Sequence, residues 1–595
     1  MLLVVPMLAA LAVVLLSGNR RWSKYVAIVG SMSGLLLLYF ISYGTTTLPW
    51  FTIGNFTFNI TMTIEQFNLA LLFVVLFIGS LIMVYSSAFM ELLSEQRRYY
   101  AEMLAFEISM VVFAMSGNFI LLFIAWEFLS LLSYLLIGFW HVRDRANRAA
   151  RLAVTTVFIG DIALIAAIVI FWSYFGSLEF STILASVPAV IPIRLYAGVL
   201  LLLLAIFTKS AQFPFQEWLP EAMEGPTPVS AFLHSSTMVK AGVFAAIILF
   251  PLLYGANVLP VILAVGIITA VISTLNAMKE TQIKKVLAYS TVQELALMLI
   301  AVSVGAIFAA IYFFVIQSFY KALLFLSSGS IMRSTNEEHL GNVSGLRSNK
   351  LLFASTLIGV LSVAGFFPLS GFFAAASLDT TIFGNMLVYV IISLVGFGTS
   401  FYIFRWFFNV SKRPAGVGVE IRYSGESRRI VYPAALLALS TVAASVIFLG
   451  IERFLSQGAA SAPYLSNSLP LGIGLYDAII FTVLIIAGAV ISYLVYASRY
   501  SKRLLRVGMG PLKSLVYSHM VFMAVYNLLA KFVYYIGDGI GFFDDSLNTA
   551  LDYLGHTVIA IASRFRRISV GAINPYAFIF IIGLIFLLAY AYMVV

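Results

Sequence analysis

The sequence predicts an all-α polytopic membrane protein, and three observations lead to that fold class. Of the 595 residues, 62% are hydrophobic and only 10% are charged, a ratio that a soluble core cannot absorb. The basic residues gather at the ends of long apolar runs. Two of those runs are interrupted by proline or glycine, the pattern typical of an internally repeated transporter.

The apolar runs predict about sixteen transmembrane helices. The first run lacks a basic start and a small-residue cleavage site, and further runs follow it, so we expect a helix rather than a signal peptide. The expected spans lie near residues 2–17, 25–43, 67–89, 99–116, 118–140, 150–173, 194–224 (interrupted), 228–250, 258–278, 284–303, 305–332, 350–378 (interrupted), 383–408, 430–450, 472–497 and 575–594.

The charges of the loops predict the orientation. With the N-terminus outside, the outside loops near 44–65, 174–193, 251–257 and 379–382 hold no lysine or arginine, and Arg453 is the single exception to basic residues lying inside. We therefore expect a multi-pass protein with its N-terminus outside. The membrane would be the cell inner or plasma membrane, or the mitochondrial inner membrane in a eukaryote.

The interrupted runs also predict how the chain is divided. The breaks at Pro214 and at Pro368 suggest two repeats of about five helices. The charged segment after residue 505 is too polar to cross repeatedly and would form a lateral amphipathic helix roughly 90 Å long. The expected divisions are N-terminal transmembrane helices in 1–98, repeats in 99–250 and 258–408, additional transmembrane helices in 430–498, the lateral helix in 505–568 and a C-terminal anchor span in 575–594.

Composition excludes several kinds of site. Cysteine is absent, which excludes disulfides, thiolate-ligated clusters, cysteine-ligated zinc and c-type haem attachment. Of the five histidines only His234 lies within an apolar run, so no bis-histidine haem site can form there. We expect no redox cofactor and no metal in this chain. The net charge of +10 is explained by the span ends, so we expect no nucleic-acid partner.

The run from Lys209 to Phe244 places ionisable groups within a membrane-spanning segment, where each costs roughly 2.5–3.5 kcal/mol. Lys209 precedes the break at Pro214, and Glu127, on a neighbouring span, is its expected partner. A static ion pair between the two helices is the alternative. In the next span Ser230, His234, Thr237 and Lys240 fall on one polar stripe of a continuous helix, which suits a water-filled relay.

The second half carries similar groups. Gln293 and Glu294 share a helix face with Ser290, and Lys321 shares another with Gln317. Lys284 and Lys285 are either relay groups or interfacial anchors. Asp161 and Glu107 are each expected to pair with an arginine on the inside face.

Four stretches resemble a known family: WEFLSLLSYLLIGFW, the Lys209–Phe244 run, IKKVLAYSTVQEL and FYKALLFLSSGSI. They are similar to the antiporter-like subunits of respiratory complex I, and the lateral helix with its final span is typical of NADH dehydrogenase subunit 5, the L-type chain. They are also similar to the large subunit of Mrp-type Na⁺/H⁺ antiporters, to which Lys240 looks closer. The resemblance implies inverted five-helix repeats with broken helices and a mid-membrane proton relay. Its members here would be Glu127, Lys209, His234, Lys240, Lys284, Glu294 and Lys321.

The chain departs from the family pattern at several positions. It has Ala374 to Ala376 where a lysine and an acid usually follow the second break, and Phe313 and Gln317 where histidines are common. Glu294 replaces a usual glutamine, and Phe158 a usual arginine near Asp161. We therefore expect the outer half-channel to be silent or to run through Glu294 or Asp379.

Three hypotheses follow. The first is a proton-translocating subunit of a complex I-like NADH/quinone oxidoreductase, driven by electron transfer in partner subunits that contact the lateral helix 505–568. The second is a Na⁺/H⁺ antiporter subunit of an Mrp-like assembly. The third is a distal structural subunit whose lateral helix clamps its neighbours, which the alanines at 374–376 favour.

Overall fold

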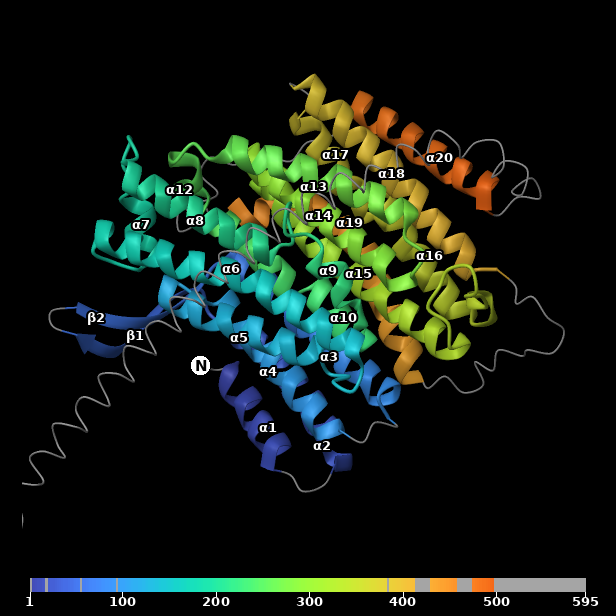
Figure 1. The fold of residues 1–595 in the computed structure, drawn as a ribbon, viewed down its shortest axis with the longest axis horizontal. Helices are drawn as coiled ribbons and strands as arrows, with labels where there is room; N and C mark the ends of the chain where they lie inside the picture. Colours follow the sequence, from blue (N-terminus) through green and yellow to red (C-terminus); the bar gives the residue numbers. More distant parts are fainter. Residues whose placement is uncertain are drawn as a thin grey trace, which may run out of the picture. The chain divides into compact units, whose positions relative to one another are not determined.

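The structure is a computed structural model that describes residues 3–16, 20–53, 56–91, 95–382, 385–412, 428–456 and 474–496. These residues belong to one compact unit, Met1–Gly510, and are mostly helical (Figure 1). Eleven of the described helical segments are long and apolar enough to cross a membrane, and two shorter apolar helices accompany them. The expected lateral helix 505–568 and anchor span 575–594 lie outside the described residues, and the division into repeats stays a prediction.

The helices follow the expected spans closely. Those of the first half are α1 (Val4–Leu16), α2 (Arg20–Leu37), η1 (Leu38–Phe40), α3 (Gln66–Phe89), α4 (Gln96–Ala114), α5 (Phe119–Ile137), α6 (Asp144–Phe175), α7 (Phe180–Ala185), α8 (Ile193–Lys209), α9 (Trp218–Glu221), η2 (Ala222–Glu224), α10 (Thr227–Ser235), η3 (Met238–Lys240), α11 (Ala241–Ile248) and α12 (Phe250–Gly255). Those of the second half are α13 (Leu259–Lys279), α14 (Ile283–Ser303), α15 (Ile307–Thr335), η4 (Leu346–Ser348), α16 (Lys350–Ala364), α17 (Ser370–Ile382), α18 (Met386–Val410), α19 (Arg428–Ser456) and α20 (Leu475–Tyr496).

A β-hairpin occupies the outside loop expected near residues 44–65. Strands β1 (Gly44–Ile53) and β2 (Phe56–Ile64) pair antiparallel, and they are rich in the threonine and aromatic residues that favour strands. The rings of Phe51 and Phe58 stack across the pair at 4.5 Å. Backbone hydrogen bonds from Thr63 and Gly117 join β2 to the segment between α4 and α5, so the hairpin is fixed to the bundle.

The first helix break follows α8. The Thr208 carbonyl, which the end of the helix leaves without an intrahelical partner, accepts a hydrogen bond from Trp218 Nε1 at 3.0 Å. The amide of Phe213 donates to Thr269 Oγ1 of α13 at 2.9 Å. The break is therefore satisfied by side chains from neighbouring elements, as an irregular segment away from water requires.

The second break separates α16 from α17. Gly365 ends α16 with φ 76°, a left-handed conformation that glycine adopts without steric cost. Each break contains a cis peptide bond before proline, at Phe213–Pro214 and at Phe367–Pro368. Both interruptions expected from the sequence are therefore present.

A third interruption corrects the expectation of one continuous helix over 228–250. Helix α10 ends at Ser235, and a 3-10 turn over Met238–Lys240 leads into α11. The Thr237 hydroxyl donates to the Phe232 carbonyl at 2.8 Å, a local bond that competes with helical pairing. Because the helix is broken here, His234 and Lys240 do not lie on one continuous helical stripe, and the expected stripe is wrong.

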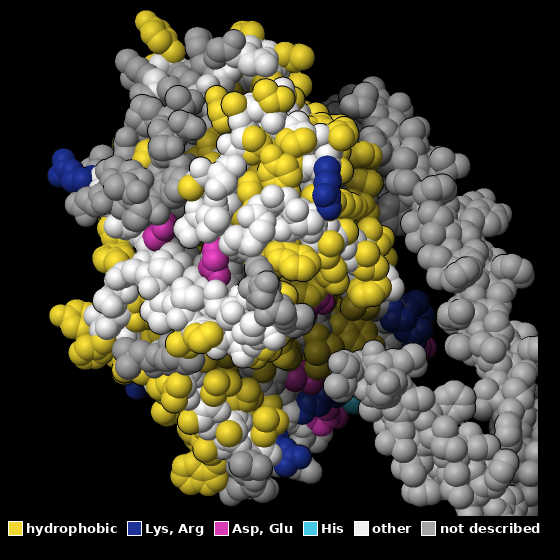
Figure 2. Space-filling model, turned by 90° about the vertical axis from the view of Figure 1, so that its left-hand side faces the viewer, with side chains coloured by type: hydrophobic (Ala, Val, Ile, Leu, Met, Phe, Trp, Pro, Cys, Tyr) yellow, Lys and Arg dark blue, Asp and Glu magenta, His cyan; other side chains and the backbone are white. Residues whose placement is uncertain are grey.

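Burial divides the bundle into inner and outer helices. The segment Thr227–Ile248 and helices α14 and α15 are almost wholly buried, whereas α2 and α20 expose most of their side chains. Figure 2 shows one face of the molecule on which hydrophobic side chains are abundant and charged ones are few. Such a surface suits contact with lipid, and the inner helices carry most of the predicted relay residues.

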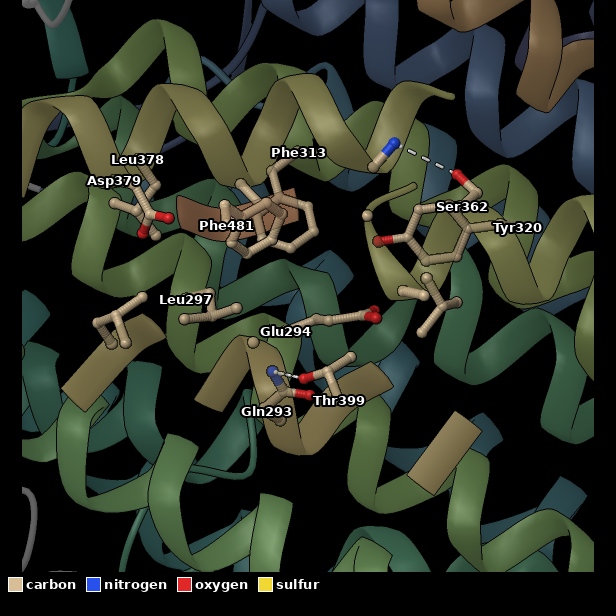
Figure 3. Close-up of a pocket in the computed structure, with 17 residues that line it drawn as sticks. Gln293, Glu294, Leu297, Phe313, Tyr320, Ser362, Leu378, Asp379, Thr399 and Phe481 are labelled. Carbon is tan, nitrogen blue, oxygen red and sulfur yellow. Dashed lines mark hydrogen bonds between the residues drawn. The ribbon is translucent and has the colours of Figure 1, made fainter. Parts of the chain in front are cut away.

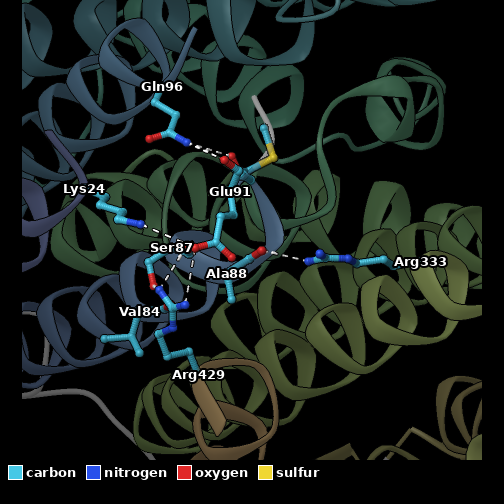
Figure 4. A network of polar contacts seen from close by, with 9 residues as sticks. Lys24, Val84, Ser87, Ala88, Glu91, Gln96, Arg333 and Arg429 are labelled. Carbon is cyan, nitrogen blue, oxygen red and sulfur yellow. Dashed lines mark hydrogen bonds and ion pairs between the residues drawn. The ribbon is translucent and has the colours of Figure 1, made fainter. Parts of the chain in front are cut away.

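A polar network ties five helices together at one end of α3 (Figure 4). Glu91 lies 3.6 Å from Lys24 of α2 and 3.5 Å from Arg429 of α19. Gln96 of α4 donates to the Glu91 carbonyl at 2.7 Å, and Arg333 of α15 donates to the Ala88 carbonyl at 2.8 Å. The last carbonyls of α3 thus find partners, including a basic side chain at the negative end of the helix dipole.

The close approach at the second break makes a stability prediction. A Cβ at Gly371 would lie 1.8 Å from the backbone oxygen of Ser362, whereas one at Gly341 would meet nothing within 4 Å. We expect Gly371→Ala to destabilise the protein by ~1–3 kcal/mol through overpacking, and Gly341→Ala to have little effect. Thermal unfolding of the two purified variants checks this, and equal midpoints would contradict it.

Candidate functional site

A fully buried lysine at the end of α8 reaches toward α5 and α6. Lys209 Nζ donates to the Trp126 carbonyl at 3.0 Å and to Ser130 Oγ. It lies 4.6 Å from the centroid of the Trp126 ring, within cation–π range, and 3.7 Å from Asp161 Oδ1. Side chains from α5 and α6 thus converge on one positive charge.

The carboxylate paired with this lysine is Asp161 of α6, and not Glu127 as the sequence suggested. Trp126 Nε1 donates to Asp161 Oδ1 at 2.6 Å, and the Ser130 hydroxyl donates to Oδ2 at 3.0 Å. Trp126 and Ser130, four residues apart, share the face of α5 that meets Lys209, whereas Glu127 acts on Lys209 through its charge and makes no ion pair with it among the described residues. Glu127 is half-buried, and its Oε1 has no hydrogen-bond partner among the described residues. Asp161 was expected to pair with an arginine, and that expectation is wrong because its ion-pair partner is Lys209.

His234 and Lys240 occupy the interrupted segment between α8 and α13. His234 is 1% exposed, its ring lies 6.0 Å from that of Phe325, and neither ring nitrogen has a hydrogen-bond partner among the described residues. Lys240 is fully buried and donates to the Phe314 carbonyl and to Ser318 Oγ of α15. It also lies 4.5 Å from the centroid of the Phe314 ring. Each group faces protein rather than lipid.

A second buried ion pair joins α15 to α14. Lys321 Nζ lies 3.2 Å from Glu294 Oε1 and donates to Ser290 Oγ at 2.5 Å. The Tyr402 hydroxyl of α18 lies 2.8 Å from Ser290 Oγ and 2.6 Å from Gln293 Oε1. This pair repeats the arrangement at Lys209, where a serine hydroxyl also lies beside the lysine.

A cavity of about 40 Å³ adjoins the second pair (Figure 3). Glu294 and Asp379 both line it, together with Leu297, Phe313 and Ala375. A volume of this size holds roughly two or three water molecules. Asp379 is 1% exposed and lies one helical turn beyond Ala375, so the cavity has a carboxyl group on α14 and another on α17.

Lys284 is placed differently from the other candidate residues. It lies in the first turn of α14, where its Nζ donates to the Gly225 carbonyl at 2.9 Å and to the Met223 carbonyl. It lines a separate cavity of about 170 Å³ with Glu224 and Glu338. Within the described part of the chain, no hydrogen bond or ion pair links it to Lys209, Lys240 or Lys321. Its neighbour Lys285 pairs with Glu221 at 2.5 Å.

Two features of the site were not foreseen. Trp126 was not among the residues predicted from the sequence, although its carbonyl, ring and indole nitrogen all take part in the Lys209 centre. Tyr402 was also missed because its helix is distant in sequence from α14. A tryptophan one position before a mid-span acid was the available signal for Trp126. Tyr402 lies in a helix that also carries Tyr389, Thr399 and Arg405, so no pattern selected it.

Comparison with known proteins assigns the family. A model described as NADH:quinone oxidoreductase/Mrp antiporter, transmembrane, matches residues 116–402, and one for the N-terminus of complex I chain 5 matches residues 50–100. NADH-quinone oxidoreductase subunit L of Escherichia coli is 36% identical over 439 residues, which cover 69% of this chain and 71% of that one. The chain belongs to the NADH:quinone oxidoreductase/Mrp antiporter family.

Other members of this family align over less of their length. Subunit L of Rickettsia felis is 35% identical over 56% of this chain and 53% of its own length, so the chain spans about half the length of several curated relatives it matches. NADH-ubiquinone oxidoreductase chain 5 of Papio hamadryas is 37% identical over 58% of each chain.

Solved structures share the fold. A chain of the Mrp complex from a Dietzia species superposes on all of this chain and on 63% of its own length, with a TM-score of 0.73 and 22% identity. A chain of an archaeal membrane-bound sulfane sulfur reductase covers 79% of this chain and 99% of its own, with a TM-score of 0.67 and 17% identity. The fold expected from the family resemblance is therefore confirmed at the level of overall architecture.

The pairing of Lys209 with Asp161 can be tested by charge removal. Asp161→Asn leaves a buried lysine without its nearest carboxylate, so we expect a loss of about 3–5 kcal/mol of stability. Glu127→Gln should have a much smaller effect. In Asp161→Asn with Lys209→Met, part of the loss should return because no charge is left unpaired. Thermal unfolding of the variants measures this, and a larger loss for Glu127→Gln would contradict the pairing.

Proposed function

We propose that the chain is the proton-translocating membrane subunit of a complex I-like NADH/quinone oxidoreductase. The observation that carries the proposal is a series of buried ionisable groups, which we call the buried row: Lys209 with Asp161, His234, Lys240, and Lys321 with Glu294. Ionisable groups that face a bundle interior mark ion and proton pathways. Electron transfer would occur in partner subunits, since this chain has no cysteine for a cluster and is proposed to carry no cofactor.

The two ion pairs suggest how charge at one centre could affect the next. Each lysine is held by a carboxylate and a serine hydroxyl from neighbouring helices. Movement of either carboxylate changes how strongly the lysine charge is stabilised, because the surroundings are poorly screened. Lys240 and His234 supply protonatable groups on the interrupted segment between the pairs. Glu127, half-buried on α5, is proposed to exchange protons with the first pair.

The cavities are proposed as the two ends of the pathway. Lys284 lines the larger one, which would deliver protons from the inside, and Glu294 and Asp379 line the smaller one. Waters in the smaller cavity would carry a proton from Glu294 to Asp379. Asp379 would thereby replace the lysine and acid that the family usually has near Ala375.

Transport against a membrane potential requires an energy source. Moving one elementary charge against 100 mV costs about 2.3 kcal/mol. We propose that other membrane subunits supply it, and that they contact the chain along the lateral helix 505–568. The proposed location is a cell inner, plasma or mitochondrial inner membrane, with the N-terminus outside.

A Na⁺/H⁺ antiporter subunit of an Mrp-like assembly is the second candidate. The likeness to the Dietzia Mrp complex favours it, because that superposition covers the whole chain. The two functions differ in their drive. Proton flux that depends on Na⁺ and needs no electron donor would identify the antiporter.

The central prediction concerns Lys209→Met. If the buried row is the pathway, this variant should lose proton pumping while donor oxidation and the assembled complex persist. Pumping by membrane vesicles, measured beside donor oxidation, checks this. Lys350→Met is the matched control, because Lys350 is exposed at the start of α16, and it should pump normally. Unchanged pumping in Lys209→Met would overturn the pathway.

The proposed outer end is tested by Asp379→Asn. We expect slower pumping with an intact Lys209 centre, because the last carboxyl group beside the cavity can no longer ionise. Asp144→Asn is the control, since Asp144 is exposed at the start of α6. The same vesicle measurement applies, and wild-type pumping by Asp379→Asn would remove Asp379 from the path.

A further inference from the structure

A buried carboxyl group lies among α2, α3 and α4, outside the buried row. Glu107 of α4 has no exposed surface, and Ser31 Oγ of α2 donates to its Oε1 at 2.7 Å. Ser80 Oγ of α3 lies 3.0 Å from Ser31 Oγ. Gly79 leaves the space for the carboxyl group, since a Cβ there would lie 2.4 Å from Glu107 Oε1. The three helices thus form a pocket fitted to one acid.

No cation compensates this acid among the described residues. The arginine partner expected from the sequence is absent there, and Glu107 Oε2 has no hydrogen-bond partner in the same part of the chain. Helices α1 and α3 carry no charged residue. The nearest basic residue along α2 from Ser31 is Lys24, seven positions or ~10 Å away, and it already pairs with Glu91.

An isolated ionised carboxylate in such surroundings is very unfavourable, and a buried acid without a partner charge is held neutral instead. The hydroxyl of a neutral acid needs an acceptor, so in the neutral form the 2.7 Å contact reverses: Glu107 donates through Oε1 to Ser31 Oγ, and the Ser31 hydroxyl donates to Ser80 Oγ. One carboxyl with two hydroxyls fits a proton better than a metal ion. The described residues also contain no group of three or more acidic or histidine side chains that could hold a metal.

The pocket also borders the interrupted segment that carries His234 and Lys240. A Cβ at Gly79 would also lie 3.2 Å from the ring of Phe232 of α10. That ring packs edge-on against the ring of Phe106, with the centroids 5.7 Å apart. Phe232 lies two residues before His234. The glycine that faces the acid therefore also faces a ring of the helix that carries the histidine.

We propose that Glu107, Ser31 and Ser80 form a proton-binding site outside the buried row. Glu107 carries the proton, and the two hydroxyls exchange it with water. The ligand is the proton itself. The evidence for this site is its own geometry, so the site exists whether or not the buried row translocates protons.

Infrared spectroscopy of the intact purified complex tests the site directly. The carbonyl band of a protonated carboxyl is distinct from that of a carboxylate and shifts when its proton is replaced by deuterium. We expect wild-type protein to show a protonated-carboxyl band that Glu107→Gln lacks and that shifts after transfer to D₂O. Ser31→Ala should slow that shift. Lys209→Met should leave the band in place, which separates this site from the proposed function.

Glu95→Gln is the control, because Glu95 pairs with Arg98 at the surface and its loss should not alter the band. If Glu107→Gln fails to fold, labelling of Glu107 in wild-type protein by an apolar carbodiimide, which reacts with protonated acids, gives the same answer by peptide mass. An ionised or unlabelled Glu107 would overturn the proposal. A band that does not shift in D₂O would also overturn it, because the acid would then be a locked structural group.

Discussion

Lys209 and Lys321 are both fully buried, and each is balanced by one carboxylate from a neighbouring helix, at 3.7 Å from Asp161 and 3.2 Å from Glu294. Removing a charge from water costs several kcal/mol, and only close partners with additional hydrogen bonds compensate it. This requirement explains why each lysine also meets a serine hydroxyl. It also explains why the inner helices α14 and α15 are packed so completely, since any opening to lipid would leave the pairs without polar surroundings.

The helix breaks follow from the same requirement. A continuous helix uses its carbonyl groups mainly for its own backbone, although Trp126 in α5 and Phe314 in α15 also accept from lysines. The end of α8 and the interruption after Ser235 release further carbonyl groups within the bundle. Some of these are taken by Trp218 Nε1 and by the Thr237 hydroxyl. The broken segments thus add polar groups at depth to those carried by continuous helices, without exposing backbone to lipid.

The sequence predicted most spans to within a few residues because apolar length is a local property. The span expected at 67–89 is α3 (Gln66–Phe89), and both proline breaks were located. Lys209, His234, Lys240 and Lys321 were also predicted, because an ionisable residue within an apolar run can be recognised from the sequence alone. Partners were harder to predict: Asp161 lies on a different helix from Glu127, and only tertiary packing decides which carboxylate faces Lys209. The hairpin was missed because charge counting assigns a side of the membrane and no structure.

Gly79 and Glu107 illustrate a dependence between positions that are 28 residues apart and chemically unlike. Any side chain at position 79 would occupy the volume that the carboxyl group fills, and a small apolar residue at position 107 would leave a void facing the glycine. Neither position can change alone without a steric clash or a cavity. During evolution the two must therefore be gained or lost together, so that in an alignment of relatives a glycine at 79 and an acid at 107 should form a covarying pair.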